Sequence, residues 1–522
     1  MSKLYMTRRQ VLGNAAALAT LTALGIHSNR VLGAENNILK VRLPDDIKVL
    51  DPRYMTSIAE SNVLYMCMPR LAVQDKQADG TWGWKPSEYV ESIRQDDGTH
   101  ISFTLKKGMM WSDNAGEITA DDVKFSFERM LKSEYFGASW PTLDHVDVKD
   151  KYSGIIVLKS PFAATMLIGV SFVAGTIVPK SLVEKMKDQK YSLPLPAQCG
   201  PYAMVEWTPR QKAVLKANPD WWGAKPSFQE VHLVQVTDAK AAEFALETGE
   251  IDVTNVPPDT ALRYMKASPQ HVKLISSPGP GFTWMGMNTQ NPKLADVRVR
   301  KAIQRAIDPD AILQGAYAGL SPRAYGVVPN GMLGHRDKSN YSFNPEEAKA
   351  LLQDAGVSGL TLDIKTPADD AAQVAACQII QSYLGEIGIN MTVTPVDSGT
   401  YWDLGQESKG DAWKALELYV MRYSTAPDPS DALSSFQKKQ IGAWNWERWS
   451  DPEFEDLTQK GMAESDSNKR AAIYVRMQGI MENSGAYFWI TFAPVFYGYR
   501  DWIAPPYIDP NGWLRPELFA KA

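Results

Sequence analysis

Polar and apolar residues alternate along two early segments of the chain, which is the pattern of strands with one buried face. Apolar side chains occupy every second position over residues 39–43 and again over residues 101–105. The second segment follows the turn Asp96-Asp97-Gly98, which favours a tight hairpin. We therefore predict a strand at residues 39–43 and a hairpin over residues 91–107.

Helical periodicity begins at several residues whose side chains commonly cap a helix. Thr119 precedes an apolar face at helical spacing and has Asp122 three residues on, a variant of the capping box. Asp296, Asp308 and Asn344 stand at the same place before other amphipathic segments. Further helices are predicted over residues 57–66, 241–248 and 468–481.

Residues 360–395 predict a parallel sheet, because an amphipathic helix (371–384) lies between two apolar strands (360–364 and 389–395). Two other segments are candidates for passages between domains. Residues 276–281 read as a flexible loop before a buried strand (282–288), and residues 487–496 form a very apolar run. We place a domain crossing at the first and a return at the second.

The stretch at residues 415–436 is an apolar run that breaks into a polar loop. Residues 416–420 have the composition of a buried strand, and Pro427 and Pro429 then prevent a ladder from continuing. Arg422, Tyr423 and Asp428 fall in this predicted loop. Ligands of open α/β sheets collect at the ends of strands, so this is a candidate binding loop.

Composition narrows the classes of function. At 522 residues the chain exceeds one hydrophobic core, so two or three domains are expected. A net charge of −5 without any Lys/Arg-rich run argues against nucleic-acid binding. The histidines are scattered and no catalytic motif is present, so we predict no enzyme, no metal site and no cofactor.

The cysteines are few and far apart. Cys67, Cys199 and Cys377 are odd in number and form no CxxC motif, which argues against a disulfide scaffold. Burial as small hydrophobic residues is the favoured interpretation, and a single disulfide stays open.

The N-terminus has the pattern of an export signal. Basic residues including Arg8 and Arg9 precede a weakly apolar stretch over residues 11–26, and Gly33 and Ala34 offer a cleavage site. The segment is too short and polar for a membrane span. The motif around Arg8 and Arg9 is that of a twin-arginine signal, and no Cys is placed for a lipid anchor. We expect residues 1–34 to be a signal peptide and the mature chain to be periplasmic.

Several long segments match a known family in collinear order. The most specific is QCGPYAMVEWTPRQKAVLKANPDWWG at residues 198–223, and others lie at residues 101–130, 242–253 and 287–312. The chain resembles extracellular solute-binding proteins of the peptide/opine/nickel ABC-importer type. The resemblance implies an α/β, two-lobed periplasmic-binding-protein fold (type II-like, cluster C) with an extra subdomain in the first lobe and two hinge crossings.

The resemblance also sets the domain boundaries and partners that we expect. The first lobe is placed at residues 35–280, with the extra subdomain at about 75–190. The second lobe is placed at residues 281–487, and residues 488–522 return to the first. A membrane permease with its ATPases is the implied partner of a monomeric receptor that closes around its ligand.

Within the matched loop this sequence departs from the family pattern. Peptide receptors of the family commonly place an Asp three residues before the Asp of Asp-Pro, where it pairs with the ligand's ammonium. Here that position is Thr425, and Arg422 stands nearby. A threonine does not neutralise a desolvated ammonium, whereas Arg422 suits a carboxylate. We expect a small peptide or peptide-like solute that lacks a free α-amine or carries an acid group.

The candidate ligand-binding residues combine this loop with aromatic and first-lobe positions. They are Arg422, Tyr423, Thr425, Asp428, Trp402, Trp444, Trp446, Phe282, Trp284, Met55 and Thr56. A salt bridge is the alternative role for Arg422 and turn formation the alternative for Asp428. Core packing is the alternative for the others. The open alternatives for function are a receptor for an opine, oligosaccharide or metal chelate, a chaperone-like receptor, and an exported cofactor-binding enzyme.

Overall fold

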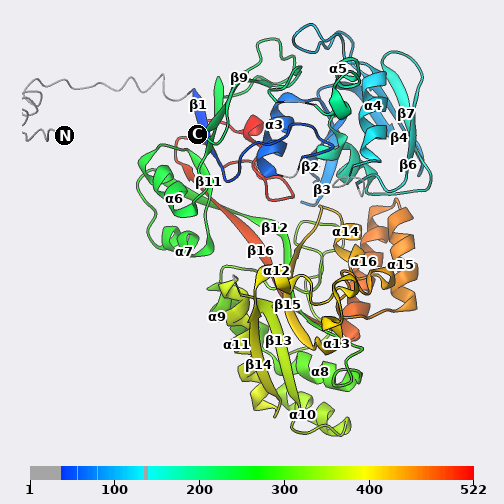
Figure 1. Ribbon diagram of the computed structural model, residues 1–522, viewed down its shortest axis with the longest axis vertical. Coiled ribbons are helices and arrows are strands. Elements are labelled where there is room, and N and C mark those ends of the chain that lie inside the picture. The colour runs from blue at the N-terminus through cyan, green and yellow to red at the C-terminus, as the bar shows by residue number, and fades with distance from the viewer. Residues whose placement is uncertain (1–36, 56, 79, 134–138, 192, 369) are drawn as a thin grey trace, which may run out of the picture.

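The computed structural model describes residues 37–55, 57–78, 80–133, 139–191, 193–368 and 370–522. Two lobes are joined by the long strands β12 (Val272–Met287) and β16 (Tyr487–Arg500), which run side by side from one lobe into the other (Figure 1). Residues before β12 and after β16 form the first lobe, and the residues between them form the second. The two-lobed α/β fold expected from the resemblance is confirmed.

One sheet runs through both lobes. In spatial order its strands are β14 (Asn390–Val396), β13 (Thr361–Pro367), β15 (Leu418–Ser424), β12, β16, β11 (Val253–Asn255), β1 (Ile38–Leu43), β10 (Glu230–Gln235), β9 (Lys212–Ala217) and β8 (Tyr202–Thr208). The predicted strand at residues 39–43 is β1. The predicted parallel unit is also present, since β13 and β14 pair in parallel around α11 (Ala371–Glu386).

The connection between the lobes is more regular than the sequence indicated. β12 and β16 pair in antiparallel register from Val272 opposite Arg500 to Gly286 opposite Tyr487. The prediction of a loop at residues 276–281 is therefore wrong. The prolines there are tolerated because the register shifts between Ser277 and Gly281, so no ladder bond requires their missing N–H groups.

The first lobe carries two further sheets. A four-stranded sheet has the order β4 (Val90–Gln95), β5 (His100–Leu105), β7 (Ser153–Leu158) and β6 (Leu143–Val148), and β2 (Ala72–Lys76) pairs with β3 (Trp82–Pro86). The predicted hairpin is the β4–β5 pair. The Thr119–Asp122 capping box opens α4 (Ala120–Met130), which lies against the four-stranded sheet (Figure 1).

The remaining helices are divided between the two lobes. Those of the first lobe are α3 (Ile58–Cys67), α5 (Lys180–Val183), α6 (Ala239–Thr248) and α7 (Pro258–Lys266). Those of the second are α8 (Val297–Ala306), α9 (Pro309–Tyr317), α10 (Pro345–Asp354), α12 (Ser398–Tyr401), α13 (Ala412–Ala415), α14 (Pro429–Ser434), α15 (Pro452–Ala463) and α16 (Ser467–Asn483). Asp296, Asp308 and Asn344 cap their helices as predicted.

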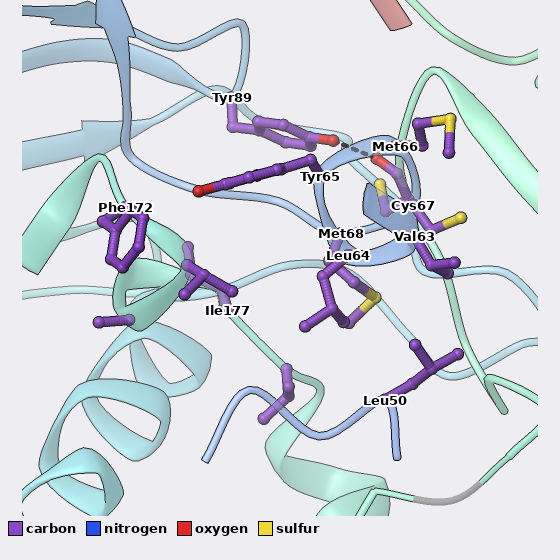
Figure 2. Close-up of a cluster of buried hydrophobic side chains, with 14 of the residues drawn as sticks. Leu50, Val63, Leu64, Tyr65, Met66, Cys67, Met68, Tyr89, Phe172 and Ile177 are labelled. Atoms are coloured by element: carbon purple, nitrogen blue, oxygen red, sulfur yellow. Dashed lines mark hydrogen bonds between the residues drawn. The ribbon is translucent and has the colours of Figure 1, made fainter. Parts of the chain in front are cut away.

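The family-like segment at residues 198–223 serves the core of the first lobe. Gly200 approaches α3 so closely that a Cβ there would lie 2.1 Å from the carbonyl oxygen of Met66. The hydroxyl of Tyr89 donates to the carbonyl of Cys199 at 2.6 Å, the bond drawn in Figure 2. The motif therefore holds α3 against the sheet through packing that only a glycine permits.

The three cysteines are buried and unpaired, as the favoured interpretation predicted. Burial raises the pKa of the Cys199 thiol to about 12, so it stays protonated. In the described part of the chain no helix is both long and apolar enough to cross a bilayer.

Candidate ligand-binding site

A cavity of about 470 Å³ lies where β15 ends in the second lobe. Four of its ten lining residues are aromatic, and we call it the aromatic cavity. Its lining residues are Phe282, Trp402, Arg422, Tyr423, Ser424, Asp431, Ala432, Ser434, Ser435 and Trp444. Five of the predicted site residues, from four separate parts of the sequence, are therefore brought together here.

The aromatic rings are arranged around Tyr423. Trp402 lies nearly parallel to it, with ring centroids 6.3 Å apart, and Trp444 meets it edge-on at 6.0 Å. The Tyr423 hydroxyl donates to the carbonyl of Trp444 at 3.2 Å, which fixes the ring. Stacked and edge-on rings of this kind offer a large apolar contact area at low entropic cost.

A second cavity of about 640 Å³ lies between the lobes and shares Ser424 and Asp431 with the first; we call it the interlobe cavity. The second lobe contributes Thr425 and Ala426 to its wall. The first lobe and the hinge strands contribute Ile58, Ser139, Ile168, Phe172, Asn255, Val256, Pro258, Pro280, Pro494, Val495, Phe496, Tyr497, Asn511, Gly512 and Trp513. A solute in this cavity touches both lobes.

Arg422 presents its charge to the aromatic cavity. It lies near the end of β15 and pairs with Thr283 of β12. Arg422 therefore belongs to the strand and not to the predicted loop. Its side chain is 54% exposed, and among the described residues the nearest carboxylate oxygen, on Asp370, lies 3.9 Å from Nη1. This contact is at the outer limit of an ion pair, which leaves the guanidinium available to a ligand.

Asp428 has a structural role in this conformation. Arg470 donates to both of its carboxylate oxygens, at 2.7 and 2.8 Å, and Ser430 N–H donates to it as the first turn of α14 begins. Burial opposes ionisation, but the Arg470 guanidinium outweighs it and lowers the pKa of Asp428. Asp428 is 2% exposed and lines neither cavity, so the turn-forming alternative describes it.

Thr425 and Asp431 meet at the junction of the two cavities. The Thr425 hydroxyl lies 3.0 Å from Asp431 Oδ2, and the Ala426 N–H donates to the same oxygen at 2.7 Å. Burial raises the pKa of Asp431. The carboxylate that is missing at position 425 is thus present beside it, on the first turn of α14.

The other aromatic candidates lie behind the cavity wall. Trp284 is fully buried under Phe282 and donates its Nε1–H to Glu447 at 2.7 Å. Trp446 is 1% exposed, and its ring sits so close to the backbone at Gly405 that a Cβ there would be 2.2 Å away. Both belong to the core of the second lobe and do not line either cavity.

Of the two first-lobe candidates, Met55 lies away from both cavities. Met55 is 2% exposed and lies in the core of the first lobe, outside the lining of both cavities. Thr56 lies outside the described residues. The predicted signal peptide at residues 1–34 also lies outside them.

Sequence reasoning missed Asp431 and the first-lobe wall. Asp431 follows Asp428 by three residues at the start of a helix. This spacing places Asp431 on the first turn, so the sequence could have indicated it as a site residue. Asn255, Asn511 and Trp513 had no comparable signal, because they reach the cavity only through the fold. Among the described residues no group of His, Cys, Asp and Glu is placed to hold a metal ion.

Comparison with known proteins agrees with this geometry. Residues 87–451 match the family model described as "Bacterial extracellular solute-binding proteins, family 5 Middle". The chain is 27% identical over 446 residues to the dipeptide-binding protein of Escherichia coli K12, covering 80% of this chain and 82% of that one. It is 25% identical over 493 residues to the probable D,D-dipeptide-binding periplasmic protein DdpA of the same strain, covering 90% and 92%. The solved structure of HbpA2 from Haemophilus parasuis matches with a TM-score of 0.80 at 21% identity, over 93% of this chain and 99% of that one.

Proposed function

Because the chain belongs to the bacterial extracellular solute-binding proteins of family 5, we propose that it is the receptor of an ABC importer for a small peptide or peptide-like acidic solute. The family consists of binding proteins and not of enzymes, and its members work with a permease and its ATPases. The solute binds in the aromatic and interlobe cavities, which meet at Ser424 and Asp431.

The observation that supports an acidic ligand is the environment of the Arg422 side chain. Its guanidinium lines an aromatic cavity, is more than half exposed, and within the described part of the chain has its nearest carboxylate 3.9 Å away, on Asp370. A planar fork of donors binds a carboxylate through two parallel hydrogen bonds. The aromatic rings beside it suit an apolar side chain of the same solute.

Asp431 supplies the opposite charge at the other end of the aromatic cavity. Its carboxylate accepts from the Ala426 N–H and the Thr425 hydroxyl, and it faces both cavities. A ligand ammonium placed there gains a charge-assisted bond that Thr425 alone does not provide. We therefore extend the ligand class to zwitterions, including peptides with a free amine, held between Asp431 and Arg422.

Binding by lobe closure follows from the position of the interlobe cavity. A solute that touches both lobes favours the closed state by its differential affinity for it. We place the bending at β12 and β16, the two strands that join the lobes (Figure 1). We further propose that the protein is a monomer and that it is exported by the twin-arginine route without a lipid anchor.

The test begins with mass spectrometry of the solute that co-purifies with the protein from its native periplasm. A thermal-shift screen of peptides, opines, oligosaccharides and metal chelates accompanies it, because a tight ligand raises the melting temperature by mass action. Peptides or acidic peptide-like solutes are the expected hits. Stabilisation by sugars or chelates alone would reject the ligand class, and a bound chromophore in the absorbance spectrum would favour an exported cofactor-binding enzyme.

A further inference from the structure

The first lobe contains a third cavity, of about 500 Å³, that shares no lining residue with the aromatic or interlobe cavity. It is bounded by the end of α3, by β2 and β3, by the loop that carries Trp221, and by the C-terminal segment around Arg515. Its volume is within the range of small-molecule sites.

Arg70 is a buried cation in the wall of this cavity. It is 4% exposed, and its Nε and Nη1 atoms have no hydrogen-bond partner. Within the described part of the chain, no carboxylate oxygen comes within 4.0 Å of its guanidinium; instead its Cζ lies 4.2 Å from the ring centroid of Tyr65. A buried guanidinium without a carboxylate partner is unfavourable, because its desolvation is not offset by an ion pair.

The surrounding charges do not compensate Arg70. Arg515 contacts the same Tyr65 ring at 4.0 Å, and its charge is already matched by Glu517, whose Oε1 lies 2.6 Å from Nη2. Burial, and then the field of Arg515, lower the pKa of Arg70 to about 10, so that it is still protonated at neutral pH. The carboxylates of Glu517 and Asp509 both stabilise the Arg515 cation, whereas of these two only Glu517 does so for Arg70.

The rest of the wall combines aromatic rings with four charged side chains, of which Lys85 pairs with Asp75, and Glu88 and Lys225 are exposed. Tyr65 and Tyr89 lie next to each other with their hydroxyl groups pointing in opposite directions (Figure 2), and Trp221 packs on Tyr89 with ring centroids 5.4 Å apart. Phe519 closes the wall from the C-terminal segment. Such a surface suits the flat body of an organic molecule.

We propose that this first-lobe cavity is a second binding site, which takes a small organic monocarboxylate. The ligand's carboxylate binds the Arg70 guanidinium, and its apolar body lies against Tyr89 and Trp221. Glu517 restricts the class to a single negative charge, because its Oε2 is buried in the same wall without a partner and repels a second one.

Benzoate is the probe, and benzamide is its uncharged counterpart of the same shape. In isothermal titration calorimetry of the purified protein, benzoate binds and benzamide binds at least about tenfold more weakly, as expected when a charged hydrogen bond is lost. Because the aromatic cavity also offers a guanidinium to a carboxylate, the titration is repeated in Arg422→Ala, in which benzoate still binds and the further change Arg70→Gln abolishes that binding. If Arg70→Gln does not fold, Arg70→Lys replaces it. The lysine keeps the positive charge without the planar guanidinium donors, and it weakens benzoate binding by a similar factor.

Three outcomes would overturn the second site. Benzoate affinity equal in the wild type and in Arg70→Lys would do so, as would its loss in Arg422→Ala. Stabilisation by sodium chloride equal to that by sodium benzoate would assign the cavity to an inorganic anion. The result is independent of the interlobe ligand, since a failed screen at the aromatic cavity leaves the benzoate titration unaffected.

Discussion

Two charged groups only six residues apart, Arg422 and Asp428, have opposite situations. Arg422 is more than half exposed, faces an aromatic cavity and, counting the described residues, has a carboxylate no closer than 3.9 Å. Asp428 is 2% exposed and is held on both oxygens by Arg470. The difference teaches that the end of β15 divides into a part that faces solute and a part that holds the second lobe together.

Two acidic residues nearby, Asp431 and Glu447, show the same contrast between the cavity side and the interior. Asp431 faces both cavities, whereas Glu447 lies fully buried beneath the cavity wall, where Trp284 donates to it. Charges on the cavity side should therefore control affinity with little effect on stability, and charges on the interior side should do the reverse. Each of the following substitutions tests one half of this contrast.

The largest expected effect is on stability, from Asp428→Ala. Removing one partner of a buried, bidentate ion pair leaves Arg470 uncompensated and costs about 3–5 kcal/mol. Urea unfolding followed by tryptophan fluorescence measures the loss. The control is Asp411→Ala, whose pair with Lys414 is exposed, and it should change stability little. A small effect of Asp428→Ala would place this residue on the cavity side.

Glu447→Gln tests the interior through pH. Burial raises the pKa of Glu447 from 4.5 to about 7, so the folded state binds the proton more tightly than the unfolded state does. The resulting stability is complete below pH 4.5 and is lost as the pH rises through 7, by roughly 3 kcal/mol at most. The glutamine variant should lose this slope and be the more stable protein at pH 8.

Melting temperatures at pH 5 and pH 8 measure the slope, with the exposed Glu386→Gln as the matched control. A slope in Glu447→Gln as steep as in the wild type would show that Glu447 titrates normally, against the interior assignment.

Arg422→Ala tests the cavity side. It should weaken an acidic ligand by about 1.5–3 kcal/mol, the worth of a hydrogen bond to a charged group, without changing the melting temperature of the free protein. Arg476→Ala is the control, because Arg476 is similarly exposed (56%) and pairs with Glu453 on the helices α15 and α16. Equal affinities in the wild type and Arg422→Ala would reject the role of Arg422.

Asp431→Asn should have a smaller effect that depends on the ligand. The amide oxygen still accepts from Ala426 N–H, so only the charge is lost, and a ligand with a free amine should weaken by about 1 kcal/mol. The same peptide with an acetylated amine provides the comparison and should bind both proteins equally. Equal losses for the two peptides would mean that Asp431 acts only by holding the loop.

The sequence predicted much of the fold because its signals are local. Helix caps at Asp296, Asp308 and Asn344, the β4–β5 hairpin and the parallel β13–β14 unit all follow from neighbouring residues. The site was predicted only in part. Asp428 and Arg470 are 42 residues apart in sequence, and their pairing depends on how α16 packs, which no local pattern contains.

The sequence did not distinguish the position of Trp402 from that of Trp446. Substitutions of these two residues have the smallest predicted effect. Their rings are 6.5 Å apart, yet Trp402 lines the aromatic cavity and Trp446 is 1% exposed. Ligand binding should change tryptophan fluorescence in the wild type and in Trp446→Phe, and the change should shrink in Trp402→Phe. Trp402→Phe should also cost about 0.5–1 kcal/mol of affinity, because the smaller ring keeps part of the stacking. The reverse pattern, with the signal lost only in Trp446→Phe, would move the ligand behind the wall formed by Phe282, Tyr423 and Trp402.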